Sequence, residues 1–237
     1  MVFSRIFGRR RQRQEPNTPG HDDLLLMWMS TELKLQAIAA EVIELAAESI
    51  PAITFCHFEE TFEQVTHGFD ADGVGWLPLT DPAELSVPGF ALPPAVKTLV
   101  ARAADLPESD PPQPLPDEGP IIHFALAEVH PLREMDLRVL RFAASLPVRT
   151  MVHQHAAVDE PTLKLLGGGT QTTMQLMQRM GMTEVEHVQH PMLTRAVRTA
   201  QQNLAARATG NEPAESVEQW AKRNLPADLP PGQAQDG

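Results

Sequence analysis

Short apolar runs alternate with amphipathic segments over much of the chain, and this alternation constrains the fold more than any other feature of the sequence. Residues 31–48 repeat apolar side chains at spacings of three and four, which predicts a helix with Ser30 or Thr31 as its N-terminal cap. Residues 51–58 open with a proline and continue as a β-branched and aromatic run, which is typical of a buried strand. Strands that alternate with helices of this length form βαβ units around a mostly parallel sheet. We therefore predict an α/β fold.

The same pattern continues as far as residue 180 and then stops. Apolar or alternating stretches predict strands at 121–129 and 148–155. Helical periodicity predicts helices at 59–66, 94–104, 130–146 and 159–180. Residues 190–224 contain only helical patterns and no strand that could pair with the sheet, so we expect a C-terminal helical extension beyond the α/β domain.

Proline-rich breaks divide the chain, whose length of 237 residues suits one domain with appendages. Inside the domain, residues 105–120 alternate proline with acid and predict a solvated loop. The predicted organisation is a basic amphipathic segment and linker at 1–20, an α/β domain at 21–180, a helical extension at 181–225 and a disordered tail at 226–237.

Acidic residues outnumber basic ones, 31 to 19, which gives a formal net charge of −12. Contact with phosphates needs a positive face, so we predict no nucleic-acid partner. Cys56 is the only cysteine, which excludes an internal disulfide and a four-cysteine zinc site. The sequence has neither an apolar stretch of about 18 residues nor an N-terminal signal core, so we expect a cytoplasmic protein.

The first 13 residues depart from this acidic character, because they hold five arginines and no acid. On a helix, their apolar side chains would form one stripe surrounded by cations, as in anchors that lie on anionic lipid. The residues concerned are Phe3, Arg5, Ile6, Phe7, Arg9, Arg10, Arg11 and Arg13. We predict that they bind a partner or an anionic membrane surface, which would place the protein peripherally at the inner face of the membrane. A solvated tail and a chance RNA contact are the alternatives.

Residues in four segments of the chain match a single known family in their order and in their spacing. The C-terminal segment contributes Gly181, Met182, His190, Pro191, Thr194, Arg195, Ala196, Ala200, Gln201 and Arg207. The earlier segments contribute Lys34, Ala37, Pro51, Glu60, Glu63, His123, Glu128, His130, Arg133, Asp136, Asp159 and Glu160. In order and spacing these residues resemble SecA, the ATPase motor of bacterial preprotein translocation. The resemblance covers roughly 30–68 and 120–207, and it implies one RecA-like (P-loop NTPase-like) domain, the second of SecA, followed by the start of its helical scaffold.

The motifs that would make such a domain an ATPase are missing from the sequence. No G-x-x-x-x-G-K-[ST] phosphate loop occurs, and the glycine run at 167–169 lacks the lysine. In SecA the second domain supplies arginines that reach the γ-phosphate, and the aligned positions here are Phe142 and Ser145. Their loss removes charge that stabilises phosphoryl transfer. We therefore predict no catalytic residues, no cofactor and no enzymatic activity.

Two further groups of residues are candidate binding sites. One predicted helix carries a remnant anion site in one interpretation, and in the favoured interpretation its ion pairs tie the helix to its neighbours. The residues of this group are His130, Arg133, Arg138 and Arg141. The histidine pairs 153/155 and 187/190 have metal-ligand spacing, but neither has a third ligand nearby in sequence, so no metal site is predicted.

A resemblance to SecA that lacks the ATPase motifs implies a non-catalytic accessory or regulatory interaction protein in preprotein translocation. The expected partners are translocase components, either SecA or the channel, which would contact the polar flank of the 191–207 helix: Arg195, Gln201 and Arg207. The alternative for this helix is that its apolar stripe packs on the α/β domain while the flank is solvated. For the whole chain, the alternatives are a divergent ATPase completed by a partner chain and a SecA-derived domain with an unrelated role.

Overall fold

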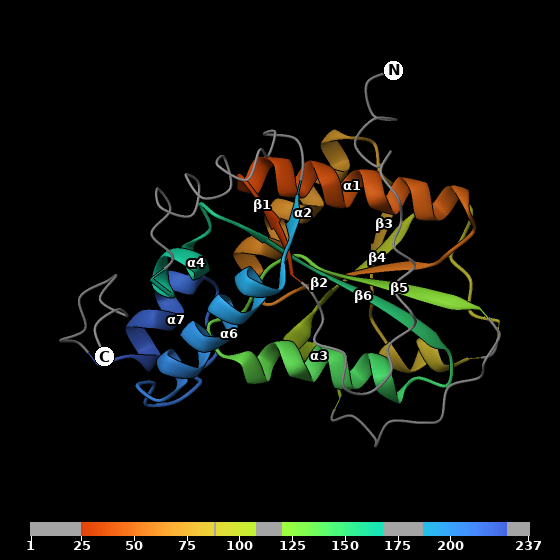
Figure 1. Ribbon diagram of the computed structural model, residues 1–237. Coiled ribbons are helices and arrows are strands. Elements are labelled where there is room, and N and C mark those ends of the chain that lie inside the picture. Colours follow the sequence, from red (N-terminus) through yellow and green to blue (C-terminus); the bar gives the residue numbers. More distant parts are fainter. Residues whose placement is uncertain (1–24, 88, 108–119, 168–186, 227–237) are drawn as a thin grey trace.

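A computed structural model describes residues 25–87, 89–107, 120–167 and 187–226 (Figure 1). In these ranges seven strands form one sheet in the order β3-β4-β2-β5-β6-β1-β7, and only the β1–β7 pairing is antiparallel. The strands are β1 (Leu25–Trp28), β2 (Ala52–Cys56), β3 (Trp76–Pro78), β4 (Thr98–Arg102), β5 (Ile121–Leu126), β6 (Arg149–Ala157) and β7 (Val188–Gln189). The predicted α/β class with a mostly parallel sheet is confirmed.

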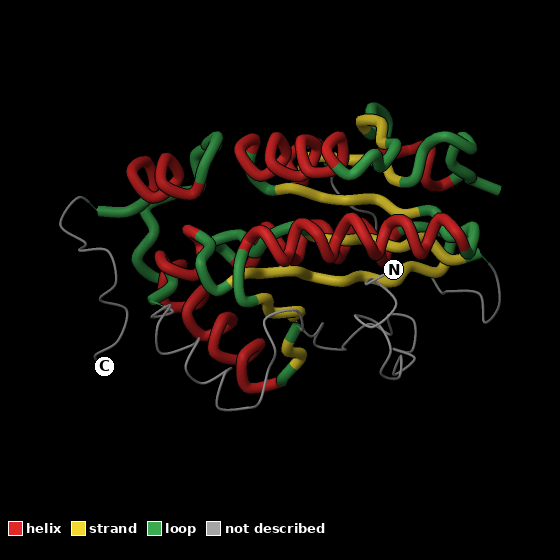
Figure 2. Tube along the Cα trace, turned by 90° about the horizontal axis from the view of Figure 1, so that it is seen from above, coloured by secondary structure: helices red, strands yellow, loops and turns green. Residues whose placement is uncertain are grey.

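One face of the sheet is covered by α1 (Thr31–Ala47) and α2 (Glu59–Ala71) (Figures 1 and 2). Of the two caps that the sequence left open, Ser30 and Thr31, Ser30 caps α1, because its hydroxyl accepts a hydrogen bond from the N–H of Leu33 at 3.3 Å. The buried stripe of α1, including Ile38 and Val42, packs against alternate residues of the central strands. Period-two alternation along each strand therefore sends one set of side chains to this helical layer and the other set to the opposite face.

The opposite face is covered by α3 (Arg133–Ser145) and, beside it, α6 (Pro191–Ala205). Phe142 of α3 packs with Phe55 of β2 and Phe124 of β5 in the largest buried cluster. The short helices α4 (Pro161–Leu165) and α7 (Val217–Asn224) pack with α6 against β1. The remaining described elements are the 3₁₀ turns η2 (Pro82–Ser86) and η3 (Ala103–Asp105).

The C-terminal helices do not form the separate extension that the sequence predicted. Leu204 of α6 and Trp220 of α7 are buried in the same cluster as Leu25 and Met27 of β1. β7, just before α6, also adds a seventh strand to the sheet where none was expected. The sequence suggested an extension because β7 has only two residues, and because β1 lacks the β-branched residues that mark a strand.

The helix predicted at 94–104 is wrong, because Thr98–Arg102 is strand β4. Thr98 and Val100 are buried between β3 and β2, and a short apolar run has no periodicity that separates a strand from a buried helix. The helix predicted at 159–180 is shorter in the described part, where α4 ends at Leu165.

Several predictions concern residues outside the described ranges. The basic segment at 1–20 lies there entirely, as do the boundary at 180/181 and most of the 105–120 loop and the 226–237 tail. Among the described residues, no helix combines the length and the apolar character that crossing a membrane requires.

Candidate functional site

The carboxyl ends of β2 and β5 are joined by Glu128, a residue of the SecA-like pattern. One carboxylate oxygen of Glu128 accepts hydrogen bonds from the N–H groups of His57 and Phe58, at 2.9 and 3.1 Å. The other accepts a hydrogen bond from the Thr61 hydroxyl at 2.6 Å. Open α/β sheets usually bind ligands at this edge. Here the carboxylate of Glu128 instead satisfies the backbone at the start of α2.

A buried ion pair between Lys34 and Glu160 joins α1 to the segment that follows β6. The ammonium of Lys34 contacts the Glu160 carboxylate and donates a hydrogen bond to the carbonyl of Ala127 at 2.5 Å. Both side chains are almost completely buried. Burial raises the pKa of Glu160 above its usual value, although the charge of Lys34 acts in the opposite direction. The pair fixes α1 against the carboxyl ends of two strands.

Asp136 of α3 is the centre of a third buried group of contacts, which we call the Asp136 network. Its carboxylate contacts His57 Nε2 at 3.0 Å, the His130 N–H at 3.0 Å and Gln201 Nε2 at 2.8 Å. Two guanidinium groups lie slightly farther away, those of Arg133 at 3.5 Å and Arg198 at 3.6 Å. Burial alone raises the pKa of Asp136, but the hydrogen bond and charge of His57, with the His130 N–H and Arg133, outweigh it and lower the pKa. The carboxylate therefore holds β2, α3 and α6 together.

The residues predicted as a remnant anion site have protein partners in the structure. Arg133 pairs with Asp136, Arg138 donates to the carbonyl of Leu106, and Arg141 pairs with Glu134 at 2.5 Å. His130 is buried between the rings of Phe58 and Trp220. Anion binding at these residues stays a prediction, and the contacts favour the interpretation in which they tie the helix to its neighbours.

His130 makes the folded state sensitive to acid. Burial and the charge of nearby His57 lower its pKa from 6.5 to about 3, and Asp136 only partly opposes this. Below its ordinary pKa the unfolded chain takes up a proton at this ring while the folded chain does not, so folding stability falls as the pH falls. We expect His130 to account for a loss of about 2 kcal/mol between about pH 7.5 and about pH 5.

Urea unfolding at the two pH values measures this loss. His130→Asn keeps an acceptor for the N–H of Leu132, which the His130 ring now accepts at 3.0 Å, and it should remove that part of the pH dependence. His67→Asn, at an exposed histidine, serves as the control and should change nothing. An unchanged pH dependence in His130→Asn would contradict the assignment.

The predicted polar flank of α6 is only partly exposed. Arg195 and Arg207 are exposed, but Gln201 is completely buried and donates hydrogen bonds to Asp136 and to the carbonyl of His130. The prediction that Gln201 is available to another chain is therefore wrong. Spacing placed it beside the arginines, whereas the close approach of α6 to α3 turns it into the core.

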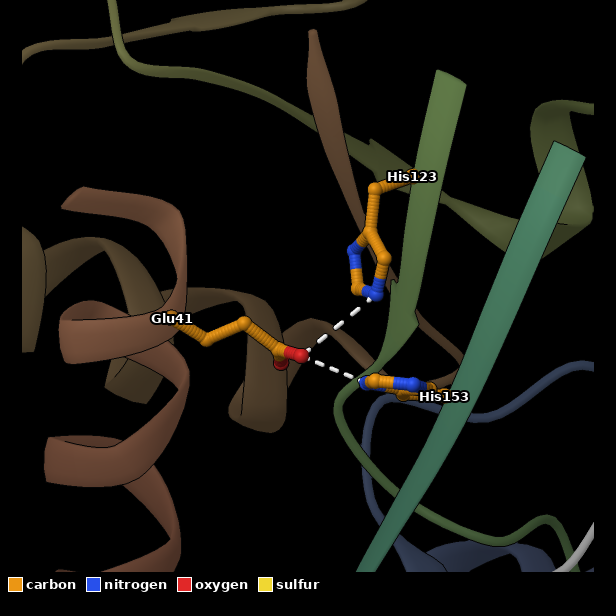
Figure 3. Close-up of side chains that lie close together, drawn as sticks. All are labelled: Glu41, His123 and His153. Carbon is orange, nitrogen blue, oxygen red and sulfur yellow. Dashed lines mark hydrogen bonds and ion pairs between the residues drawn. The ribbon is translucent and has the colours of Figure 1, made fainter. Parts of the chain in front are cut away.

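A fourth group of contacts, made by titratable side chains, lies on the face of the sheet beneath α1. We call Glu41, His123, His153 and His155 the histidine cluster. Oε1 of Glu41 lies 2.5 Å from His153 Nδ1 and 3.4 Å from His123 Nε2 (Figure 3). Oε2 of Glu41 lies 3.2 Å from His155 Nε2. Burial alone raises the pKa of Glu41, but the charges of His123 and His153 and the hydrogen bonds of His153 and His155 hold it well below its usual range. Glu41 is therefore an ionised carboxylate among imidazoles.

Sequence reasoning identified half of this cluster. The sequence predicts that His153 and His155 share one strand face, but it places no third ligand near them. The fold supplies the missing groups from α1 and β5. The pair formed by His187 and His190 gains no such neighbours among the described residues. Cys56 is buried, as the apolar strand around it suggested, and burial raises the pKa of its thiol well above the usual value.

Comparisons with known proteins add no relative to this picture. No protein-family model matches the chain, and no curated protein matches it.

Proposed function

We propose that the chain is a non-catalytic, SecA-like accessory or regulatory protein that acts by binding components of the preprotein translocase, either SecA or its channel. One observation carries the proposal. Residues that match SecA in order and spacing come from distant segments, yet they contact each other: Lys34 with Glu160, and Asp136 with Gln201. These contacts span 126 and 65 positions of the chain. A chance likeness of four segments gives no reason for the matched residues to meet.

A RecA-like fold is part of this proposal. The parallel strands β4-β2-β5-β6-β1 with helices on both faces suit such a domain. The SecA-like residues at the carboxyl edge then have a simple explanation, because they hold the helices against the sheet. They would be kept for packing after the nucleotide chemistry was lost.

The positions aligned with the γ-phosphate arginines support a non-catalytic role. Phe142 is only 4% exposed and stacks on Phe124, with ring centroids 6.2 Å apart. Ser145 donates its hydroxyl hydrogen bond to the carbonyl of Phe142 at 2.8 Å. An arginine at the Phe142 position would bury a charge in an apolar cluster, which costs several kcal/mol unless it is paired. Phe142 therefore belongs to the hydrophobic core and not to a charged site.

Binding to the translocase of the same organism tests the proposal directly. We expect the purified chain to bind purified SecA, or the channel in anionic lipid nanodiscs, in a saturable way. Arg195→Glu with Arg207→Glu reverses two charges on exposed positions of α6 and should weaken binding at least about tenfold, because electrostatic complementarity contributes to such contacts. Lys164→Glu with Lys222→Glu makes the same change in charge elsewhere on the surface and should have little effect.

Two outcomes would contradict this function. Absence of binding to both SecA and the channel would exclude translocase components as partners. Micromolar binding of magnesium and ATP by the chain alone, measured by calorimetry, would favour the divergent ATPase instead. Equal binding by the two double variants would leave the partnership standing but move the contact away from α6.

A further inference from the structure

The register of β5 and β6 brings three histidines onto one face of the sheet. Ala125 of β5 lies opposite His153 of β6, so His123 and His153 are offset by two positions and point to the same side. Their ring centroids are 4.6 Å apart. His155 follows on the same face, and Glu41 of α1 contacts all three rings. Figure 3 shows its carboxylate facing His123 and His153. The fold thus surrounds one carboxylate with imidazole nitrogens.

The distances within the cluster suit a small divalent ion. One donor atom each from Glu41, His123 and His153 lie within 4.8 Å of one another. A four-coordinate zinc ion has bonds of about 2.0–2.1 Å, which separates neighbouring ligand atoms by about 3.3 Å. The 3.4 Å separation of Glu41 and His123 already matches this value. The 2.5 Å separation of Glu41 and His153 would lengthen by less than about 1 Å, which a small rotation of the half-buried His153 ring allows.

His155 has a different role from the three ligand candidates, because a hydrogen bond from Trp28 fixes the position of its ring proton. The indole N–H of Trp28 donates to His155 Nδ1 at 3.2 Å, and an indole nitrogen can only donate. The neutral His155 ring must therefore carry its proton on Nε2, which lies 3.2 Å from the second carboxylate oxygen of Glu41. A protonated Nε2 cannot bind a metal, but it can hold a ligating carboxylate in place.

We propose that Glu41, His123 and His153 bind a zinc ion, and that His155 and Trp28 orient the carboxylate behind it. Two imidazoles and one carboxylate form a donor set that zinc prefers, and three protein ligands leave one position for water. The ion would reach the site past His153, whose side chain is 23% exposed, because His123 is completely buried. It would join α1 to β5 and β6, so its loss would loosen one face of the domain. This site is independent of the proposed function.

Zinc titration of the full chain without an affinity tag tests the site. After treatment with a chelator and dialysis, the protein competes with a chromophoric chelator for added zinc. We expect one zinc ion per chain with a submicromolar dissociation constant. Glu41→Gln and His153→Asn each remove one of three ligands and should weaken binding about 100-fold or more. Trp28→Phe keeps an aromatic ring but removes the N–H, and should weaken binding about tenfold through His155.

Controls separate this site from other histidines. His67→Asn changes an exposed histidine outside the cluster and should bind zinc like the wild type. Circular dichroism checks that each variant is folded, and His153→Asn, at a half-buried position, is expected to pass. Substituted cobalt should give the visible absorption of a four-coordinate site in the wild type and lose it in His153→Asn. Equal zinc affinity of the wild type and His153→Asn would overturn the proposal, as would wild-type binding weaker than about 100 μM.

Discussion

Replacing Asp136 with asparagine is expected to lower the free energy of unfolding by about 3–5 kcal/mol, because it breaks a buried network of charges. The carboxylate accepts hydrogen bonds from His57, from the His130 N–H and from Gln201, and it is completely buried. An amide has one acceptor oxygen and two N–H donors, so it cannot accept all of these bonds. It also deprives Arg133 of a buried anion. Urea unfolding followed by tryptophan fluorescence measures the loss.

The same helix provides a matched control for this substitution. Glu134 is two positions away and pairs with Arg141 at 2.5 Å, but its side chain is 66% exposed. Exposed ion pairs contribute little, so Glu134→Gln should change the free energy of unfolding by less than about 0.5 kcal/mol. If the two substitutions cost the same, the Asp136 network does not stabilise the fold.

Replacing Lys34 with methionine is expected to cost about 3–4 kcal/mol, because a buried carboxylate loses its partner. Methionine keeps much of the length of lysine, so the packing of α1 changes little. Glu160 and the carbonyl of Ala127 then lack the ammonium that now contacts both. Burial raises the pKa of Glu160, so its protonation in mild acid should reduce the loss. Unfolding of Lys34→Met at neutral and at mildly acidic pH measures both effects.

A second substitution shows whether charge or packing causes this loss. Lys34→Met combined with Glu160→Leu replaces the whole ion pair with apolar side chains of similar size. Such replacements are often neutral, so the double variant should return to within about 1 kcal/mol of the wild type. A double variant as unstable as Lys34→Met alone would show that the loss comes from packing at α1.

The predicted results share one physical cause. The Asp136 network and the Lys34–Glu160 pair lie at the carboxyl ends of the strands, where open α/β sheets usually bind ligands. In this chain the charged groups there are buried and hold helices to the sheet. The histidine cluster lies elsewhere, beneath α1, and its groups are the ones that suit an ion.

Sequence periodicity was a good guide where structure is local. The apolar spacing over 31–48 and a cap at Ser30 or Thr31 are properties of adjacent residues. The helix is confirmed as α1, and its cap is Ser30. The strand predicted at 51–58 is confirmed as β2, because its β-branched and aromatic residues suit a buried strand. The sequence predicts a helix where β4 lies and no strand where β1 lies, because four or five apolar residues show no period of their own.

By itself the sequence determined the α/β class, the helix at 31–48 with its cap at one of two adjacent residues, and the pairing of His153 with His155 on one strand face. Tertiary structure alone decided that Gln201 is buried against Asp136, and that Glu41 meets His153 from 112 positions away. Local patterns are set by the geometry of a single helix or strand, which repeats every few residues. Contacts between distant segments depend on strand order and register, and no residue records these on its own.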